Sequence, residues 1–164
     1  MNAPVYRAAR SGDTIYLRVA GLASMRNAPV LDLFLEHSRG KVATICVDLN
    51  ACTGMDSTFM GTLVGHAQAL AESGARLVIV RPGDKNRNLL AMLGVSEVVA
   101  VIDGIAAPEA DFQDLDDPQS GTLARMELIQ RAHQHLVAIS EANQAKFAPF
   151  LRALEADLGR LRAR

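Results

Sequence analysis

The sequence has few of the side chains that build surfaces for nucleic acids or membranes. It contains no tryptophan, only 4% of its 164 residues are aromatic, and its formal net charge is −1. Sparse aromatics provide no stacking platform for bases, and a net charge near zero gives no overall attraction to phosphate backbones. No window approaches the ~20 apolar residues of a membrane span, and the N-terminus lacks an apolar signal-peptide segment. We therefore expect a cytoplasmic protein that neither binds nucleic acid nor inserts into a membrane.

Motifs typical of catalytic and cofactor sites are missing as well. The chain has neither a GxxxxGK[ST] nor a GxGxxG loop, and Ser57 lies outside a GxSxG sequence. The four histidines lack zinc-ligand spacing, and His133 and His135 are predicted to point to different faces of a helix. Cys46 and Cys52 are not in CxxC spacing, so we interpret them as reduced thiols. We expect no catalytic residue, no metal and no cofactor.

A strand, a turn and a helix are predicted in the centre of the chain. Residues 44–49 form a short apolar run rich in β-branched side chains, which is typical of a buried strand, and residues 50–54 are turn formers. A helix is expected to begin at Ser57, a preferred N-cap type, and to stop at Gly74, with apolar residues at helical spacing between them. Asp56 and Ser57 therefore lie together at a helix N-terminus.

The central segment VDLNACTGMDSTFMGTLVG resembles the signature of STAS domains, the family of anti-sigma factor antagonists. The resemblance covers roughly residues 3–103 and implies an α/β fold, with a mixed β-sheet and helices packed on it. It also implies that an anti-sigma factor with serine kinase activity phosphorylates Ser57, or less favourably Thr58. The unmodified protein would bind this kinase and the phosphorylated protein would release it. Family members also include non-switching STAS subunits of transport complexes and signalling scaffolds, which bind a protein or a small ligand, and this role remains the alternative.

The helix that follows Ser57 carries a face of small residues, which predicts close contact with another surface. Each glycine inside a helix destabilises it by about 1 kcal/mol relative to alanine, so close approach is the physical reason expected for two of them. A partner protein is one candidate for that contact, and neighbouring loops of the same domain are the other. The predicted partner-binding residues are Asp56, Ser57, Thr58, Gly61, Thr62, Gly65 and Ala69.

The other elements of the first predicted domain, residues 1–103, alternate between strands and helices. Two continuous apolar runs at residues 44–49 and 76–81 predict buried parallel strands, joined by a right-handed βαβ crossover. The remaining expected elements are a hairpin of residues 5–10 and 14–20, a helix from the late twenties to residue 38, a helix of residues 84–93 capped by Asp84, and a strand of residues 98–102.

The composition changes after the last predicted strand. Residues 103–119 contain six acidic residues, no basic residue and two prolines, so we expect a solvated acidic linker at residues 104–119. Residues 120–164 read as an amphipathic helical extension, and Pro149 predicts a kink or a break near residues 145–149. One kinked helix and a helix pair both fit. The apolar stripe can pack on its own domain, form a homodimer or bind a partner.

Overall fold

The N-terminal hairpin forms where apolar and polar residues alternate on both sides of a Ser-Gly-Asp turn. In the computed structural model, which describes residues 5–104 and 107–164, β1 (Tyr6–Ser11) and β2 (Thr14–Ala23) pair antiparallel. Gly12 adopts φ 60° in the turn between them. The predicted hairpin is confirmed. Residues 1–4 of the predicted first domain and residues 105–106 of the predicted linker lie outside the described residues.

The sheet is mixed, and its strands run in the order β5-β4-β3-β2-β1-β6. β2, β3, β4 and β5 are mutually parallel, whereas β1 is antiparallel to both of its neighbours. The strands after the hairpin are β3 (Thr44–Met55), β4 (Arg76–Val80), β5 (Ala100–Ile102) and β6 (Gln113–Asp114). The predicted mixed sheet with helices packed on it is confirmed.

Two strand boundaries were predicted wrongly. The turn expected at residues 50–54 does not exist, because β3 continues through these residues to Met55 and stays paired with β2 across two register shifts. Ladder hydrogen bonds and the irregular pairing outweigh the local turn preference of the small and polar residues there. The strand expected at residues 98–102 begins only at Ala100, because Val95–Val98 form the short helix α4 after Gly94, whose φ is 72°.

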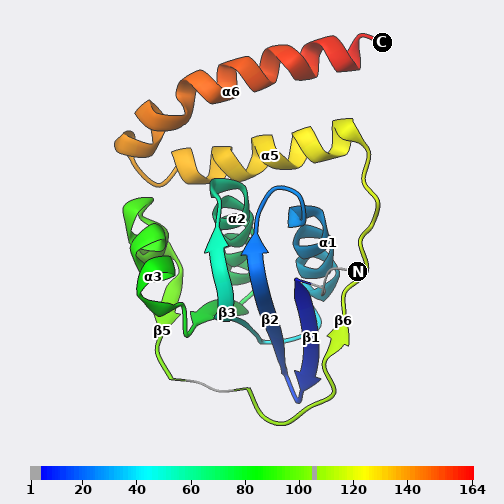
Figure 1. Ribbon diagram of the computed structural model, residues 1–164, viewed down its shortest axis with the longest axis vertical. Helices are drawn as coiled ribbons and strands as arrows, with labels where there is room; N and C mark the ends of the chain where they lie inside the picture. Colours follow the sequence, from blue (N-terminus) through cyan, green and yellow to red (C-terminus); the bar gives the residue numbers. More distant parts are fainter. Residues whose placement is uncertain (1–4, 105–106) are drawn as a thin grey trace.

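One face of the sheet is covered by helices and holds the core. Side chains of β3 alternate, so that Ile45, Val47 and Leu49 face the buried cluster that includes Leu63 and Leu70 of α2. Figure 1 shows α1 (Ala28–Ser38) and α2 (Ser57–Glu72) behind the sheet, so that the opposite face of the sheet is turned toward the viewer. The helix α3 (Gly83–Met92) starts before Asp84, which lies in its first turn instead of capping it as predicted.

The acidic linker carries a structural role that the sequence did not predict. Its residues Gln113 and Asp114 pair with β1 as the edge strand β6, and Phe112 beside them is buried. The ring of Phe112 lies 3.7 Å below the guanidinium carbon of Arg18, and Arg7 donates to the Phe112 carbonyl. The linker therefore covers the edge strand of the sheet instead of running free in solvent.

The C-terminal extension is a helix pair, α5 (Thr122–Val137) and α6 (Glu141–Arg162). The break lies at residues 138–140 and not near residues 145–149, because the Ser140 hydroxyl caps α6 by accepting from the Asn143 amide, while Pro149 lies inside the helix. In Figure 1, α5 crosses the end of α2 and α6 lies on α5. No helix within the described residues is long and apolar enough to span a membrane.

Candidate functional site

Asp56 joins two segments at the N-terminus of α2. Its backbone is extended, with φ −105° and ψ 177°, and Oδ1 accepts a hydrogen bond from the Phe59 amide at 2.9 Å. Oδ2 accepts from the amide of Met25 in the β2–α1 loop at 2.8 Å. The N-cap is therefore Asp56, and the expectation that Ser57 fills this position was wrong by one residue. With its two oxygens, the Asp56 carboxylate satisfies one free amide of the α2 N-terminus and one amide of the β2–α1 loop at once.

Ser57, the first residue of α2, contacts the C-terminal extension. Its Oγ lies 2.9 Å from Nε2 of His133 on α5. The other ring nitrogen of His133, Nδ1, lies 2.8 Å from the carbonyl oxygen of Ile129. Because a carbonyl oxygen can only accept, Nδ1 carries the proton, and in the neutral ring Nε2 accepts the hydroxyl proton of Ser57. The side chain predicted to be phosphorylated is thus a hydrogen-bond donor to α5.

The surroundings of His133 favour its neutral form. Only 4% of the residue is exposed, and its ring packs edge-on against Phe147 at 5.1 Å and beside Phe150 at 4.6 Å. This burial lowers the pKa of His133, although the Ile129 carbonyl and the Asp56 carboxylate both act in the opposite direction. At neutral pH the imidazole is therefore uncharged and available as the acceptor for Ser57.

Helix α5 covers the small-residue face of α2. A Cβ atom at Gly61 would overlap the backbone carbonyl of Ala132, and one at Gly65 would lie 2.5 Å from the His135 ring. The two glycines thus allow the backbones of α2 and α5 to approach closely within one chain. Thr58 and Thr62 on the same face are buried, and Ser57 is half-buried. The close contact predicted for this face exists, and its occupant is α5; partner binding there stays a prediction.

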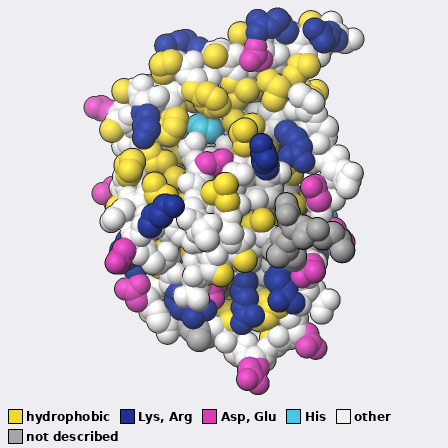
Figure 2. Space-filling view, in the orientation of Figure 1, with side chains coloured by type: hydrophobic (Ala, Val, Ile, Leu, Met, Phe, Trp, Pro, Cys, Tyr) yellow, Lys and Arg dark blue, Asp and Glu magenta, His cyan; other side chains and the backbone are white. Residues whose placement is uncertain are grey.

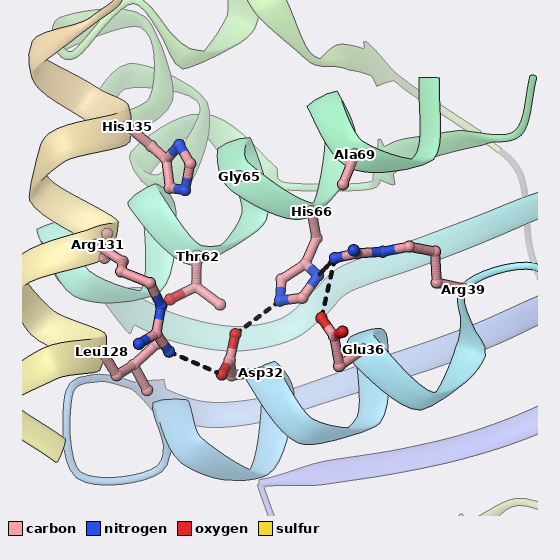
Figure 3. A pocket seen from close by; sticks show the side chains of 11 residues that line it. Asp32, Glu36, Arg39, Thr62, Gly65, His66, Ala69, Leu128, Arg131 and His135 are labelled. Atoms are coloured by element: carbon pink, nitrogen blue, oxygen red, sulfur yellow. Dashed lines mark hydrogen bonds and ion pairs between the residues drawn. The ribbon is translucent and has the colours of Figure 1, made fainter. Parts of the chain in front are cut away.

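A pocket of about 480 Å³ opens beside this contact, between α1, α2 and α5. Thr62, Gly65 and Ala69, which were predicted to bind a partner, form part of its lining (Figure 3). The charged and histidine side chains around it are Asp32, Glu36, Arg39, His66, Arg131 and His135. The predicted site residues are therefore split between the N-terminus of α2, the α5 contact and this pocket.

Asp32 connects the three helices around the pocket. Its Oδ1 lies 2.7 Å from Nε2 of the buried His66, and its Oδ2 lies 3.4 Å from a guanidinium nitrogen of Arg131 (Figure 3). Burial acts to raise the pKa of Asp32, but the hydrogen bond and charge of His66 and the charge of Arg131 outweigh it and lower the pKa. Asp32 therefore stays ionised at neutral pH and attracts Arg131 of α5 toward α1.

Sequence reasoning did not identify the residues through which α5 reaches the site. His133 was considered only as a zinc ligand and rejected, and the contributions of Asp32, His66 and Arg131 depend on helices far apart in the sequence. The available signal was the pair of glycines in α2, which predicted a close neighbour without naming it. Within residues 5–104 and 107–164, no group of three His, Cys, Asp or Glu side chains is arranged to hold a metal ion.

A known family model matches the first part of the chain. The family model described as "Mlab, STAS domain" matches residues 6–102, which is more than half of the 164 residues. The match stops before the linker, so α5 and α6 lie outside it. No curated protein matches the chain.

Several solved structures share the fold at low sequence identity. The anti-sigma factor antagonist SpoIIAA in its unphosphorylated form is 16% identical, with 61% of this chain and 89% of that chain covered and a TM-score of 0.52. The phosphorylated form of SpoIIAA, a Bacillus cell fate determinant, is 17% identical, with 61% of this chain and 91% of that chain covered and a TM-score of 0.52. The TM1081 protein of Thermotoga maritima is 19% identical, with 61% of this chain and 87% of that chain covered and a TM-score of 0.57. At these identities the similarity shows a common fold.

Proposed function

Because this chain belongs to the STAS domain family, we propose that it is a protein-interaction module controlled by phosphorylation of Ser57. The unmodified protein binds an anti-sigma factor with serine kinase activity, and the phosphorylated protein releases it. In this role the chain is a kinase substrate and not an enzyme. SpoIIAA, described as an anti-sigma factor antagonist with phosphorylated and unphosphorylated forms, supports the proposal by its shared fold.

The observation that carries the proposal is the hydrogen bond between Ser57 and His133. A phosphate on Ser57 replaces the donated hydroxyl proton with oxygens that carry about −1.5 to −2 charges at pH 7. Keeping the contact would then require a proton on the His133 ring, whose charged form is disfavoured by its burial, and the Asp56 carboxylate repels the phosphate. The N-terminus of α2 itself tolerates a phosphate because its free amides and dipole favour anions. The modification therefore weakens the contact between α5 and the N-terminus of α2 and leaves α2 folded.

Exposed apolar side chains around Ser57 support a protein partner. Leu22 lies beside Gly54 at the end of β2, Met25 donates its amide to Asp56, and Phe150 packs on His133; these three are 59%, 52% and 44% exposed. Figure 2 shows hydrophobic side chains around a histidine between the C-terminal helices and the sheet. Exposed apolar groups gathered at one place mark interaction surfaces. An added phosphate charge at the centre of this surface would oppose docking.

A non-switching STAS subunit of a transport complex or signalling scaffold is the second candidate. The packing of α5 on α2 favours it, because α5 fills the space above Gly61 and Gly65. The two glycines then have a structural explanation within one chain. A homodimer through the C-terminal helices also stays a prediction, although Leu154 and Leu158 of the α6 stripe are already buried.

Phosphopeptide mapping of the protein purified from its own cells, under growth and under stress, tests the proposal. A phosphate on Ser57 whose occupancy changes with conditions, and which is absent from Ser57→Ala, would support the switch. Full coverage of the Ser57 peptide without modification in any condition would contradict it and favour the constitutive subunit. Proteins that co-purify with the wild type and with Ser57→Ala are then identified, which shows whether the bound protein is a serine kinase.

A further inference from the structure

The sheet face opposite α1 and α2 carries a row of charged residues across three neighbouring strands. Arg7 of β1 pairs in register with Arg18 of β2, and Arg18 pairs in register with Asp48 of β3. Arg81, which follows β4, reaches the same row and donates to Asp48 Oδ2 at 2.5 Å. These four side chains line a pocket of about 350 Å³, together with Val19, Ala20, Asn50 and Ala51. Figure 2 shows Lys and Arg side chains gathered over the sheet in the lower half of this face.

The positive charges of this pocket exceed its negative charge. Asp48, the one acidic residue of the lining, is buried and already accepts from Arg81 and from the Asn50 amide. Arg7 is neutralised by Asp114 outside the pocket. Among the residues that the structure describes, no carboxylate pairs with Arg18, whose guanidinium stacks on the Phe112 ring. Two like charges directly opposite each other destabilise a strand pair, and Asp114 and Asp48 together offset only part of the positive charge of the three arginines.

Arg81 provides a second, independent observation at the same place. Its φ is 50°, a left-handed conformation that non-glycine residues rarely adopt, and its Nε atom is buried with no hydrogen-bond partner. Strained backbone clusters at active and ligand sites, and unpaired buried donors are uncommon in folded proteins. Asp48 holds the guanidinium of Arg81 in position, and its terminal N–H groups, not the buried Nε, are the donors that a ligand could reach.

We propose that this pocket binds a small ligand through a phosphate or carboxylate group. The guanidinium of Arg18 and the remaining terminal N–H groups of Arg7 and Arg81 match such groups, since arginine binds both with parallel hydrogen bonds. Asn50 adds an amide to the lining, and Val19, Ala20 and Ala51 leave room for the rest of a small molecule. The volume lies within the range of small-molecule sites. Asp48 holds Arg81 in place and repels the ligand's anionic group, which limits the affinity.

Titration of the full chain by amide NMR tests this site, with inorganic phosphate and succinate as probes and chloride holding the ionic strength constant. We expect saturable shifts confined to β1, β2, β3 and residues 80–82. Arg18→Gln weakens binding by about tenfold or more, as expected for a lost charge-assisted hydrogen bond. A response to phosphate alone, or to succinate alone, identifies the anionic group.

The matched control is Arg152→Gln, which removes an exposed arginine of α6 outside the pocket lining. It should bind the probe as tightly as the wild type. Thermal unfolding of each variant shows whether its fold is intact. The absence of saturable binding of either probe to the wild type, or an equal loss in Arg152→Gln and Arg18→Gln, would overturn the assignment. This result does not depend on Ser57 or on its modification.

Discussion

The hydroxyl of Ser57 donates to Nε2 of His133 over 2.9 Å, and this bond joins the first turn of α2 to a helix outside the matched STAS segment. The extension is thus part of the candidate site. Close packing at Gly61 and Gly65 and the attraction between Asp32 and Arg131 hold the same helix in place. A change at Ser57 therefore acts on the position of α5.

Replacement of His133 tests how much this contact contributes to stability. His133→Ala removes a hydrogen bond and the packing on Phe147, so we expect the free energy of unfolding to fall by about 2–4 kcal/mol. Urea unfolding followed by circular dichroism measures the change. His37→Ala is the control, because His37 is exposed on α1 and should be neutral within about 0.5 kcal/mol. Equal stability of the two variants would contradict the assigned contact.

The glycines of α2 and α6 should respond in opposite directions to alanine. Gly61→Ala places a methyl group against the Ala132 backbone, which cannot move without shifting α5, so we expect a loss of about 1–3 kcal/mol. Gly159→Ala on α6 meets no atom within 4 Å and should gain up to about 1 kcal/mol from helix propensity. Thermal unfolding compares the two. A stabilised Gly61→Ala would show that α5 does not pack there.

Asp56 and Ser57 should differ in their effect on stability, because only Asp56 caps the helix. Asp56→Ala removes the bonds to the Phe59 and Met25 amides and is expected to cost about 1–2 kcal/mol. Ser57→Ala removes one hydrogen bond to His133 and should cost about 1 kcal/mol or less. Unfolding in urea ranks the two variants, and the reverse order would restore Ser57 as the cap.

Stability should decrease in mildly acidic solution. Burial lowers the pKa of both His133 and His135; nearby His66 and Arg131 lower that of His135 further, and Asp32 opposes them. In the unfolded chain both titrate near their ordinary value of about 6.5. Below that pH the unfolded chain binds protons that the folded chain does not, so the free energy of unfolding falls as the pH decreases and is unaffected by these groups above it.

Urea unfolding at pH 7.5 and pH 5.5 measures this dependence. The variant with His133→Gln and His135→Gln cannot take up these protons, so its stability should change less between the two conditions than that of the wild type. Identical pH profiles for the two proteins would show that other groups cause the effect.

The sequence was sufficient for strands β1 to β5 and for the helix N-terminus at which Asp56 and Ser57 lie, since both follow from local patterns. The short apolar runs of β3 and β4, with an amphipathic helix between them, are typical of a buried βαβ crossover. The Asp56-Ser57 pair was found from its position before that helix. Strand ends were less predictable, because β3 continues through turn-forming residues by pairing with β2.

The contact between α5 and α2 could not be predicted, because it depends on tertiary packing. Ser57 and His133 are 76 positions apart, and nothing in either segment specifies the other. The position of the break in the extension also depended on Ser140, a single cap, which outweighed Pro149 as a helix boundary. The row of charged residues formed by Arg7, Arg18 and Asp48 was missed for the same reason, since its members lie on separate strands.

Hydrogen–deuterium exchange shows whether a phosphate on Ser57 loosens α5. Protein with phosphoserine incorporated at position 57 during synthesis is compared with unmodified protein, with phosphoserine at Ser73, at the other end of α2, as the control. We expect faster exchange in residues 122–137 for the modified Ser57 protein alone, with unchanged protection in β3 and β4. Equal protection of α5 in all three proteins would contradict this expectation.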